Sequence, residues 1–96
     1  MKQQQFKTLG DSVQEVLHEY GIEKKVKQHQ VIGLWSQLVG ENVAHVAKPA
    51  RVVDQTLYVK VKGMAWRTEL QFQKHSIIEQ IEKKIGPGII EDIRFF

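Results

Sequence analysis

The chain has 96 residues, 42% hydrophobic and 26% charged, with a net charge of +3, and this balance predicts a single globular domain over residues 1–96. It contains no cysteine, which excludes disulfides, thiolate zinc sites and cysteine nucleophiles. No apolar run approaches the ~20 residues that span a bilayer, and the polar N-terminus lacks a signal peptide's apolar core, so we expect a cytoplasmic protein without a membrane partner.

The N-terminal half has the hydrophobic periodicity of helices. Apolar residues at three- and four-residue steps predict a helix over about residues 6–20, with Gly21 as its left-handed stop. The basic stretch 23–27 is expected to add a turn or two of helix. A further helix is predicted over about residues 30–45. Because glycine inside a helix costs about 1 kcal/mol relative to alanine, we expect Gly40 to break or redirect it.

After Pro49 the hydrophobic period changes from 3.6 to 2, which predicts a β-hairpin with strands near residues 50–53 and 57–61. If Asp54 and Gln55 form a two-residue loop, both strands agree on which face is apolar. A tight turn prefers a glycine, which is absent here, so a longer loop is kept as the alternative. The expected cross-strand pairs are Val52 with Leu57, Ala50 with Val59, and Arg51 with Tyr58.

A long amphipathic helix is predicted over about residues 64–85, followed by the stop Gly86-Pro87-Gly88 and an alternating terminal strand within residues 89–96. A helix that joins two strands of one sheet normally makes them parallel. We therefore predict an α+β fold of order α-α-β-β-α-β, with a small three-stranded mixed sheet and helices packed on one face. Trp35 and Trp66 lie on apolar helical stripes and are expected in the core.

Residue types that carry chemistry in enzymes do not converge in this sequence. The four histidines are dispersed over different predicted elements, which indicates no metal site. The serines lack the glycine-rich elbow of a nucleophile, and no phosphate-binding loop is present. We therefore predict no catalytic residue, no metal and no cofactor.

Basic residues alternate with an aromatic residue on the outward face of the predicted hairpin. Single-stranded nucleic acid requires such a combination, because its phosphates need cations and its bases need flat surfaces on which to stack. A sheet face exposed to solvent is also often rich in lysine for solubility alone, so both interpretations stay open. The candidate nucleic-acid-binding residues are Arg51, Tyr58, Lys60, Lys62 and Arg94, with Phe96 as a neighbour and Lys24, Lys25 and Lys27 as an extension.

An ordered set of short motifs runs along most of the chain. It comprises residues 35–40 (WSQLVG), the hairpin ending at residues 57–61 (LYVKV), Ala65-Trp66 followed by Glu69-Leu70, and the closing residues 93–95 (IRF). With these motifs the sequence resembles the DciA family from about Leu9 to Phe96. The resemblance implies a KH-like domain in a non-enzymatic bacterial adaptor that helps load or operate the replicative helicase of the DnaB type during DNA replication.

The leading hypothesis is therefore an adaptor that binds the replicative helicase and, through its basic surface, single-stranded or duplex DNA. One alternative is a KH-like module that binds single-stranded DNA or RNA without the helicase. RNA-clamping KH domains carry a Gly-x-x-Gly loop, which this sequence lacks. A second alternative is a structural domain that forms homodimers through its open sheet.

Overall fold

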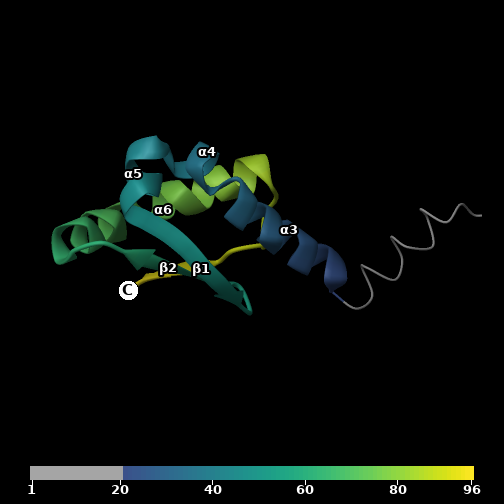
Figure 1. The fold of residues 1–96 in the computed structure, drawn as a ribbon. Helices are drawn as coiled ribbons and strands as arrows, with labels where there is room; N and C mark the ends of the chain where they lie inside the picture. Colours follow the sequence, from purple (N-terminus) through teal and green to yellow (C-terminus); the bar gives the residue numbers. More distant parts are fainter. Residues whose placement is uncertain (1–20) are drawn as a thin grey trace, which may run out of the picture.

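The computed structural model describes residues 21–96, and its three strands form one sheet in the order β1-β2-β3 (Figure 1). β1 and β2 are antiparallel, β2 and β3 are parallel, and the helices pack on one face. The predicted α+β class and mixed sheet are confirmed, whereas the helix predicted over residues 6–20 lies outside the described residues. The elements are α3 (Ile22–Gly33), α4 (Trp35–Val39), α5 (Glu41–Val46), β1 (Ala47–Val53), β2 (Thr56–Val61), α6 (Met64–Lys84) and β3 (Asp92–Phe95).

Within residues 21–96, three helices precede the hairpin, where the sequence predicts a turn or two of helix and one further helix. α3 begins at Ile22, which bears out the turns of helix expected over residues 23–27, and it runs on without a break into the start of the helix predicted from about residue 30. A break at Leu34 (φ −102°, ψ 11°) separates α3 from α4. Gly40 (φ 89°, ψ 157°) then separates α4 from α5, in a backbone region open essentially only to glycine. The redirection predicted at Gly40 is thereby confirmed.

The two tryptophans differ in burial. Trp35 is buried, and its indole N–H donates to the carbonyl oxygen of Ala47 at 2.8 Å, so its predicted core role is confirmed. Trp66 is 36% exposed, and its predicted core role is wrong. It lies in the first turn of α6, one turn before Leu70, the first buried residue of that helix. The core consists of Val31, Trp35, Leu38, Ala47, Leu57, Val59, Val61, Leu70, Ile77, Ile81, Ile89, Ile90, Ile93 and Phe95.

The hairpin loop has the two residues Asp54 and Gln55, as in the shorter of the two predicted loops. Asp54 has φ +56°, a left-handed conformation that aspartate tolerates better than most residues. The side-chain amide of Gln55 donates to the carbonyl oxygen of Gly88 at 3.1 Å and to the carboxylate of Glu91 at 3.2 Å. The glutamine therefore ties the hairpin tip to the loop before β3.

The register confirms the predicted pairs of Val52 with Leu57 and Arg51 with Tyr58. The third predicted pair is wrong, because β1 has an irregularity between Pro49 and Arg51 that puts Pro49, not Ala50, opposite Val59. One extra residue on one strand is a β-bulge. β1 also begins at Ala47, upstream of the predicted start.

Gln28 connects α3 to the rest of the domain. It is the buried polar residue of that helix, and its side-chain amide donates to the carbonyl oxygens of Asp54 at 2.7 Å and Ile89 at 3.2 Å. α3 is thereby fixed against both the hairpin tip and the loop before β3. Of the helices between Ile22 and Lys84, none has the length and apolar character that crossing a membrane requires.

Candidate nucleic-acid interface

The outward face of the sheet carries a row of three side chains that crosses all three strands. Tyr58 in β2 pairs with Arg51 in β1 and with Arg94 in β3. Arg51 and Arg94 are exposed, and Tyr58 is half-buried between them. The guanidinium carbon of Arg51 lies 4.5 Å from the centroid of the Tyr58 ring, which is cation–π distance. An aromatic ring thus stands between two cations.

A second row lies next to the first. Lys60 pairs with Lys48 of β1, and Phe96 extends from β3 on the other side. The Phe96 N–H donates to the carbonyl oxygen of Val59 at 2.9 Å, and its carbonyl oxygen accepts from the Val61 N–H at 2.7 Å, which places Phe96 beside Lys60. We term the two rows together the basic sheet face, which comprises Lys48, Arg51, Tyr58, Lys60, Arg94 and Phe96.

The bulge at Ala50 brings Lys48 onto this face. Side chains alternate along a strand, so residues 48 and 51 would point to opposite faces of a regular one. The extra residue restores both cations to the outward face, where Lys48 is exposed. Sequence reasoning missed Lys48 because it started the strand after Pro49. A strand that includes Pro49 was possible because proline is tolerated on an edge strand, and β1 is an edge strand within residues 21–96.

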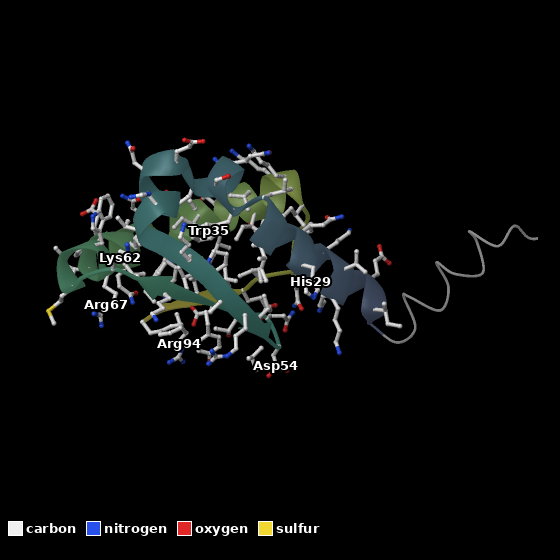
Figure 2. The ribbon with its side chains drawn as sticks, viewed as in Figure 1. His29, Trp35, Asp54, Lys62, Arg67 and Arg94 are labelled. Carbon is white, nitrogen blue, oxygen red and sulfur yellow. The ribbon has the colours of Figure 1, made fainter. Side chains whose placement is uncertain are left out.

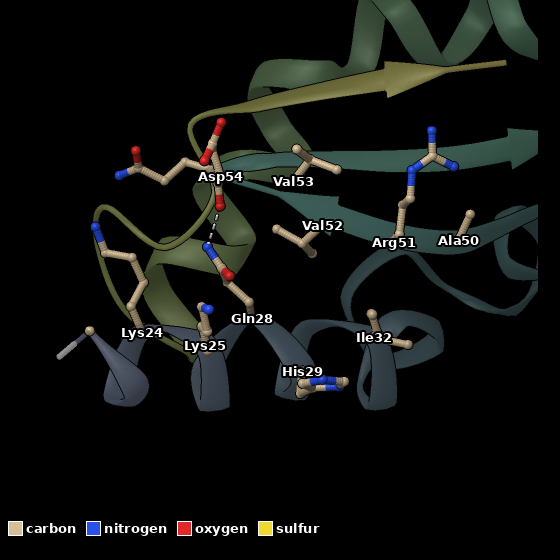
Figure 3. Close-up of a pocket in the computed structure, with 12 residues that line it drawn as sticks. Lys24, Lys25, Gln28, His29, Ile32, Ala50, Arg51, Val52, Val53 and Asp54 are labelled. Carbon is tan, nitrogen blue, oxygen red and sulfur yellow. Dashed lines mark hydrogen bonds between the residues drawn. The ribbon is translucent and has the colours of Figure 1, made fainter. Parts of the chain in front are cut away.

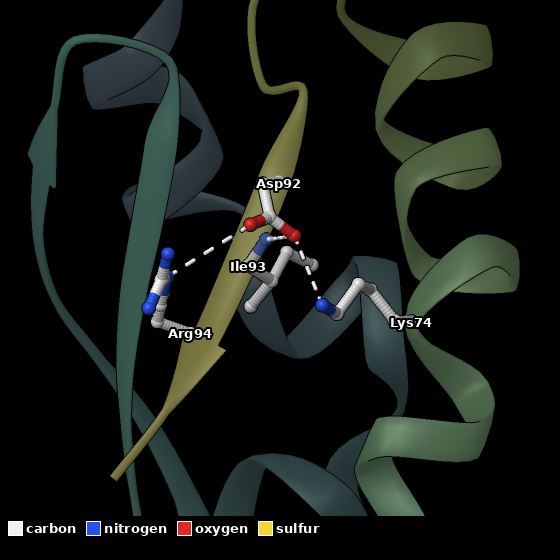
Figure 4. Close-up of polar contacts among 4 residues, drawn as sticks. All are labelled: Lys74, Asp92, Ile93 and Arg94. Atoms are coloured by element: carbon white, nitrogen blue, oxygen red, sulfur yellow. Dashed lines mark hydrogen bonds and ion pairs between the residues drawn. The ribbon is translucent and has the colours of Figure 1, made fainter.

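Asp92 reduces the positive charge at one end of the first row (Figure 4). Its Oδ1 accepts from Lys74 Nζ at 2.9 Å and from the Ile93 N–H at 2.9 Å, while its Oδ2 lies 3.9 Å from Arg94 Nε. The hydrogen bond from Lys74 holds the pKa of Asp92 below its usual value. The Ile93 N–H and the charges of Lys74 and Arg94 also lower this pKa, whereas burial raises it. Arg94 is therefore partly neutralised.

Lys62 lies outside the two rows. It follows the end of β2, and its N–H donates to the carbonyl oxygen of Val46 at 2.8 Å. Figure 2 shows it at the junction that leads into α6, whereas Arg94 lies on the sheet. Lys62 therefore adds positive charge at the end of the sheet, not on the basic sheet face itself.

Basic residues of α3 line two neighbouring hollows. Lys24 and Lys25 line a groove of about 780 Å³ between α3 and β1, whose lining also includes Arg51 (Figure 3). Lys27 lines a second, smaller hollow beside Ile89, which Lys24 also lines, and its Nζ lies 3.8 Å from the Glu23 carboxylate. Lys24 and Lys25, but not Lys27, thus line the groove beside β1 on the helix side of the sheet, whereas the basic sheet face is on the opposite side. Within residues 21–96, no group of three or more acidic or histidine side chains could hold a metal ion.

Comparison with known proteins decides the family. Residues 8–95 match the family described as Dna[CI] antecedent, DciA. The chain belongs to the DciA family. This membership confirms the resemblance.

Relatives from three organisms are similar over most of this chain. A UPF0232 protein of Rhodococcus jostii strain RHA1 is 32% identical over 79 residues, which cover 82% of this chain and 42% of the relative. A UPF0232 protein of Corynebacterium glutamicum strain R is 28% identical over 89 residues (93% and 50%). One from Mycobacterium tuberculosis strain H37Rv is 27% identical over 86 residues (90% and 46%). This DciA-family chain therefore spans about half the length of the curated relatives it matches.

Proposed function

We propose that this chain is a non-enzymatic adaptor of the helicase-loader type, which binds the DnaB-type replicative helicase and contacts DNA through its basic sheet face. Membership of the DciA family supports the helicase part of the proposal. The DNA part depends on one observation, the two rows of cations and aromatic rings on the outward face of the sheet.

The chemistry of these rows suits a single strand better than a duplex. Cations along a surface neutralise phosphates, and an exposed aromatic ring offers a base a plane on which to stack. Tyr58 and Phe96 provide such rings, and Arg51 lies against the first and 6.0 Å from the centroid of the second. The absence of a Gly-x-x-Gly loop from the sequence argues against clamping of RNA in the usual KH manner.

The experiment that tests this function is size-exclusion chromatography with light scattering. The chain is mixed with the replicative helicase of its own organism, with and without a single-stranded oligonucleotide. We expect a stable complex of chain and helicase that also retains the oligonucleotide.

Two other results of this experiment would favour the alternative functions. Retention of the oligonucleotide without a helicase complex would favour the KH-like module that acts alone. Elution of the isolated chain at twice its monomer mass, with neither partner bound, would favour the homodimerisation domain.

A further inference from the structure

The groove between α3 and β1 is distinct in shape and chemistry from the basic sheet face. It is lined on one side by residues of α3, including Lys24, Lys25 and Ile32, and on the other by residues 50–53 of β1 (Figure 3). We term it the α3–β1 groove. Among the residues that the structure describes, β1 pairs with β2 alone and is therefore an edge strand.

The register shows which backbone groups face this groove. Val59 and Val61 of β2 bond to Phe96 on the β3 side, so Thr56, Tyr58 and Lys60 direct their backbone groups towards β1. Leu57 therefore does not bond to Val52, its partner in β1. In an antiparallel ladder, two paired residues that do not bond to each other both point their N–H and C=O groups away from the partner strand. The backbone of Val52 thus faces the open edge, where Val52 lines the groove.

The accessible length of this edge is short. Pro49 has no N–H to donate, and the bulge at Ala50 disrupts regular pairing there. The hairpin loop ends the strand after Val53. An added strand can therefore pair along residues 51–53 but cannot extend past Pro49. This geometry favours one short extended segment over open-ended sheet pairing.

The lining of the groove defines the chemistry of an occupant. Lys24 and Lys25 are the lysines on the lining, and Asp54 is its one carboxylate. Arg51 also lines the groove, but its guanidinium lies over Tyr58 on the outward face and points away from α3 (Figure 3). Ile32 and Val52, both half-buried, offer apolar surface between them. An extended peptide with carboxylates and apolar side chains in alternation would complement both features, since alternate residues of a strand face opposite sides.

We propose that the α3–β1 groove binds a short, acidic, extended segment of a partner protein, which adds to the edge of β1 at Val52. The proposal stands independently of the helicase and of the basic sheet face. A peptide suits the groove better than a nucleic acid does, because its lining offers an open strand edge and, apart from the imidazole of His29, no aromatic ring for base stacking.

The test begins with a random eight-residue peptide library displayed against the immobilised full chain. We expect enrichment of peptides that alternate Asp or Glu with β-branched residues. The most enriched peptide is then synthesised with a fluorophore, and its affinity is measured by anisotropy. Lys24→Glu with Lys25→Glu should weaken binding by about tenfold, because two attractive charges become repulsive. Lys83→Glu with Lys84→Glu, the same charge change on exposed residues of α6, should leave affinity within about twofold.

Amide hydrogen exchange detects backbone pairing of the peptide with β1, which charge attraction alone would not produce. When the peptide binds, exchange of the Val52 amide should slow, because that N–H gains a backbone partner. Failure to enrich acidic peptides, equal affinity of the Lys24 and Lys25 variant, or unchanged exchange at Val52 would each overturn the proposal. Displacement of the peptide by a thymidine oligonucleotide, with exchange at Val52 unaltered, would also overturn it and assign the groove to nucleic acid.

Discussion

Lys48 and Lys60 lie directly opposite each other across the β1–β2 ladder, with both side chains exposed on the outward face. Like charges in this position destabilise a sheet. The bulge at Ala50 is what puts Lys48 on the same face as Arg51. The fold therefore places several cations on one face although two of them repel each other. A polyanionic ligand requires such an arrangement of cations.

Lys48→Glu should separate stability from binding. The substitution converts a repulsive cross-strand pair into an attractive one and should raise the free energy of unfolding by about 0.2–1 kcal/mol. It should also weaken DNA binding. Urea denaturation and oligonucleotide titration of the same preparation check both effects. A variant that lost stability would contradict the assigned pairing of Lys48 with Lys60.

Tyr58→Ala should weaken binding of a single strand by about 1–3 kcal/mol, the usual value of one base stacked on an aromatic side chain. Tyr58→Phe keeps the ring and should bind within about twofold of the original chain, because stacking does not need the hydroxyl. Fluorescence anisotropy with a labelled oligonucleotide measures both. Equal losses in the two variants would show that the hydroxyl, and not the ring, makes the contact.

Gly40→Ala should destabilise the domain by about 1–3 kcal/mol, because the backbone at Gly40 (φ 89°, ψ 157°) strains any residue with a Cβ. Gly33→Ala is the matched control. Gly33 ends α3 with ordinary backbone angles, and an added Cβ there meets nothing within 4 Å. Alanine at that position should stabilise the domain by about 0.4–1 kcal/mol. Thermal denaturation of the two variants should shift in opposite directions, and parallel shifts would refute the helix break at Gly40.

Asp92→Asn should reduce stability near neutral pH and have little effect in acid. The pKa of Asp92 is lowered in the folded chain, chiefly by the hydrogen bond from Lys74, so the carboxylate stabilises the fold above its usual pKa of 3.8. That contribution is lost as pH falls through the lowered folded-state pKa. Because the pair is partly exposed, we expect a loss of only ~0.5 kcal/mol at pH 7.

Urea denaturation as a function of pH measures this effect. The exposed Glu82→Gln on α6 is the control and should change stability little at either pH. A difference between Asp92→Asn and the original chain that persisted in strong acid would contradict the role assigned to Lys74.

Much of the fold is predictable because hydrophobic periodicity records which face of each element is buried. Leu57, Val59 and Val61 alternate as core residues of β2, and the two-residue loop follows from matching them to β1. The pattern fails where burial is slight. α3 buries only Gln28 and Val31, so the pattern predicts its first turns as a short separate stretch and does not show that they continue into the helix predicted from about residue 30.

The candidate site is predictable only in part, for reasons of register and helix position. Alternation groups Arg51, Tyr58 and Lys60 correctly, but no local rule locates a bulge, and Lys48 depends on it. Lys62 continues the alternation in sequence although the strand has already ended at Val61. The proximity of Lys24 and Lys25 to β1 follows from Gln28, whose hydrogen bonds to distant carbonyl groups give no signal in the sequence.

The measurement that tests the central claim most directly is the salt dependence of affinity for a single-stranded oligonucleotide. It compares the original chain with Lys48→Gln plus Lys60→Gln, and with Lys83→Gln plus Lys84→Gln as the matched control. We predict that the first pair lowers affinity and reduces the slope of log affinity against log salt by about 1.4, the value for two lost phosphate contacts. The control pair should leave both quantities unchanged. Equal behaviour of the two variants, or no binding by the original chain, would contradict the assignment of DNA to the basic sheet face.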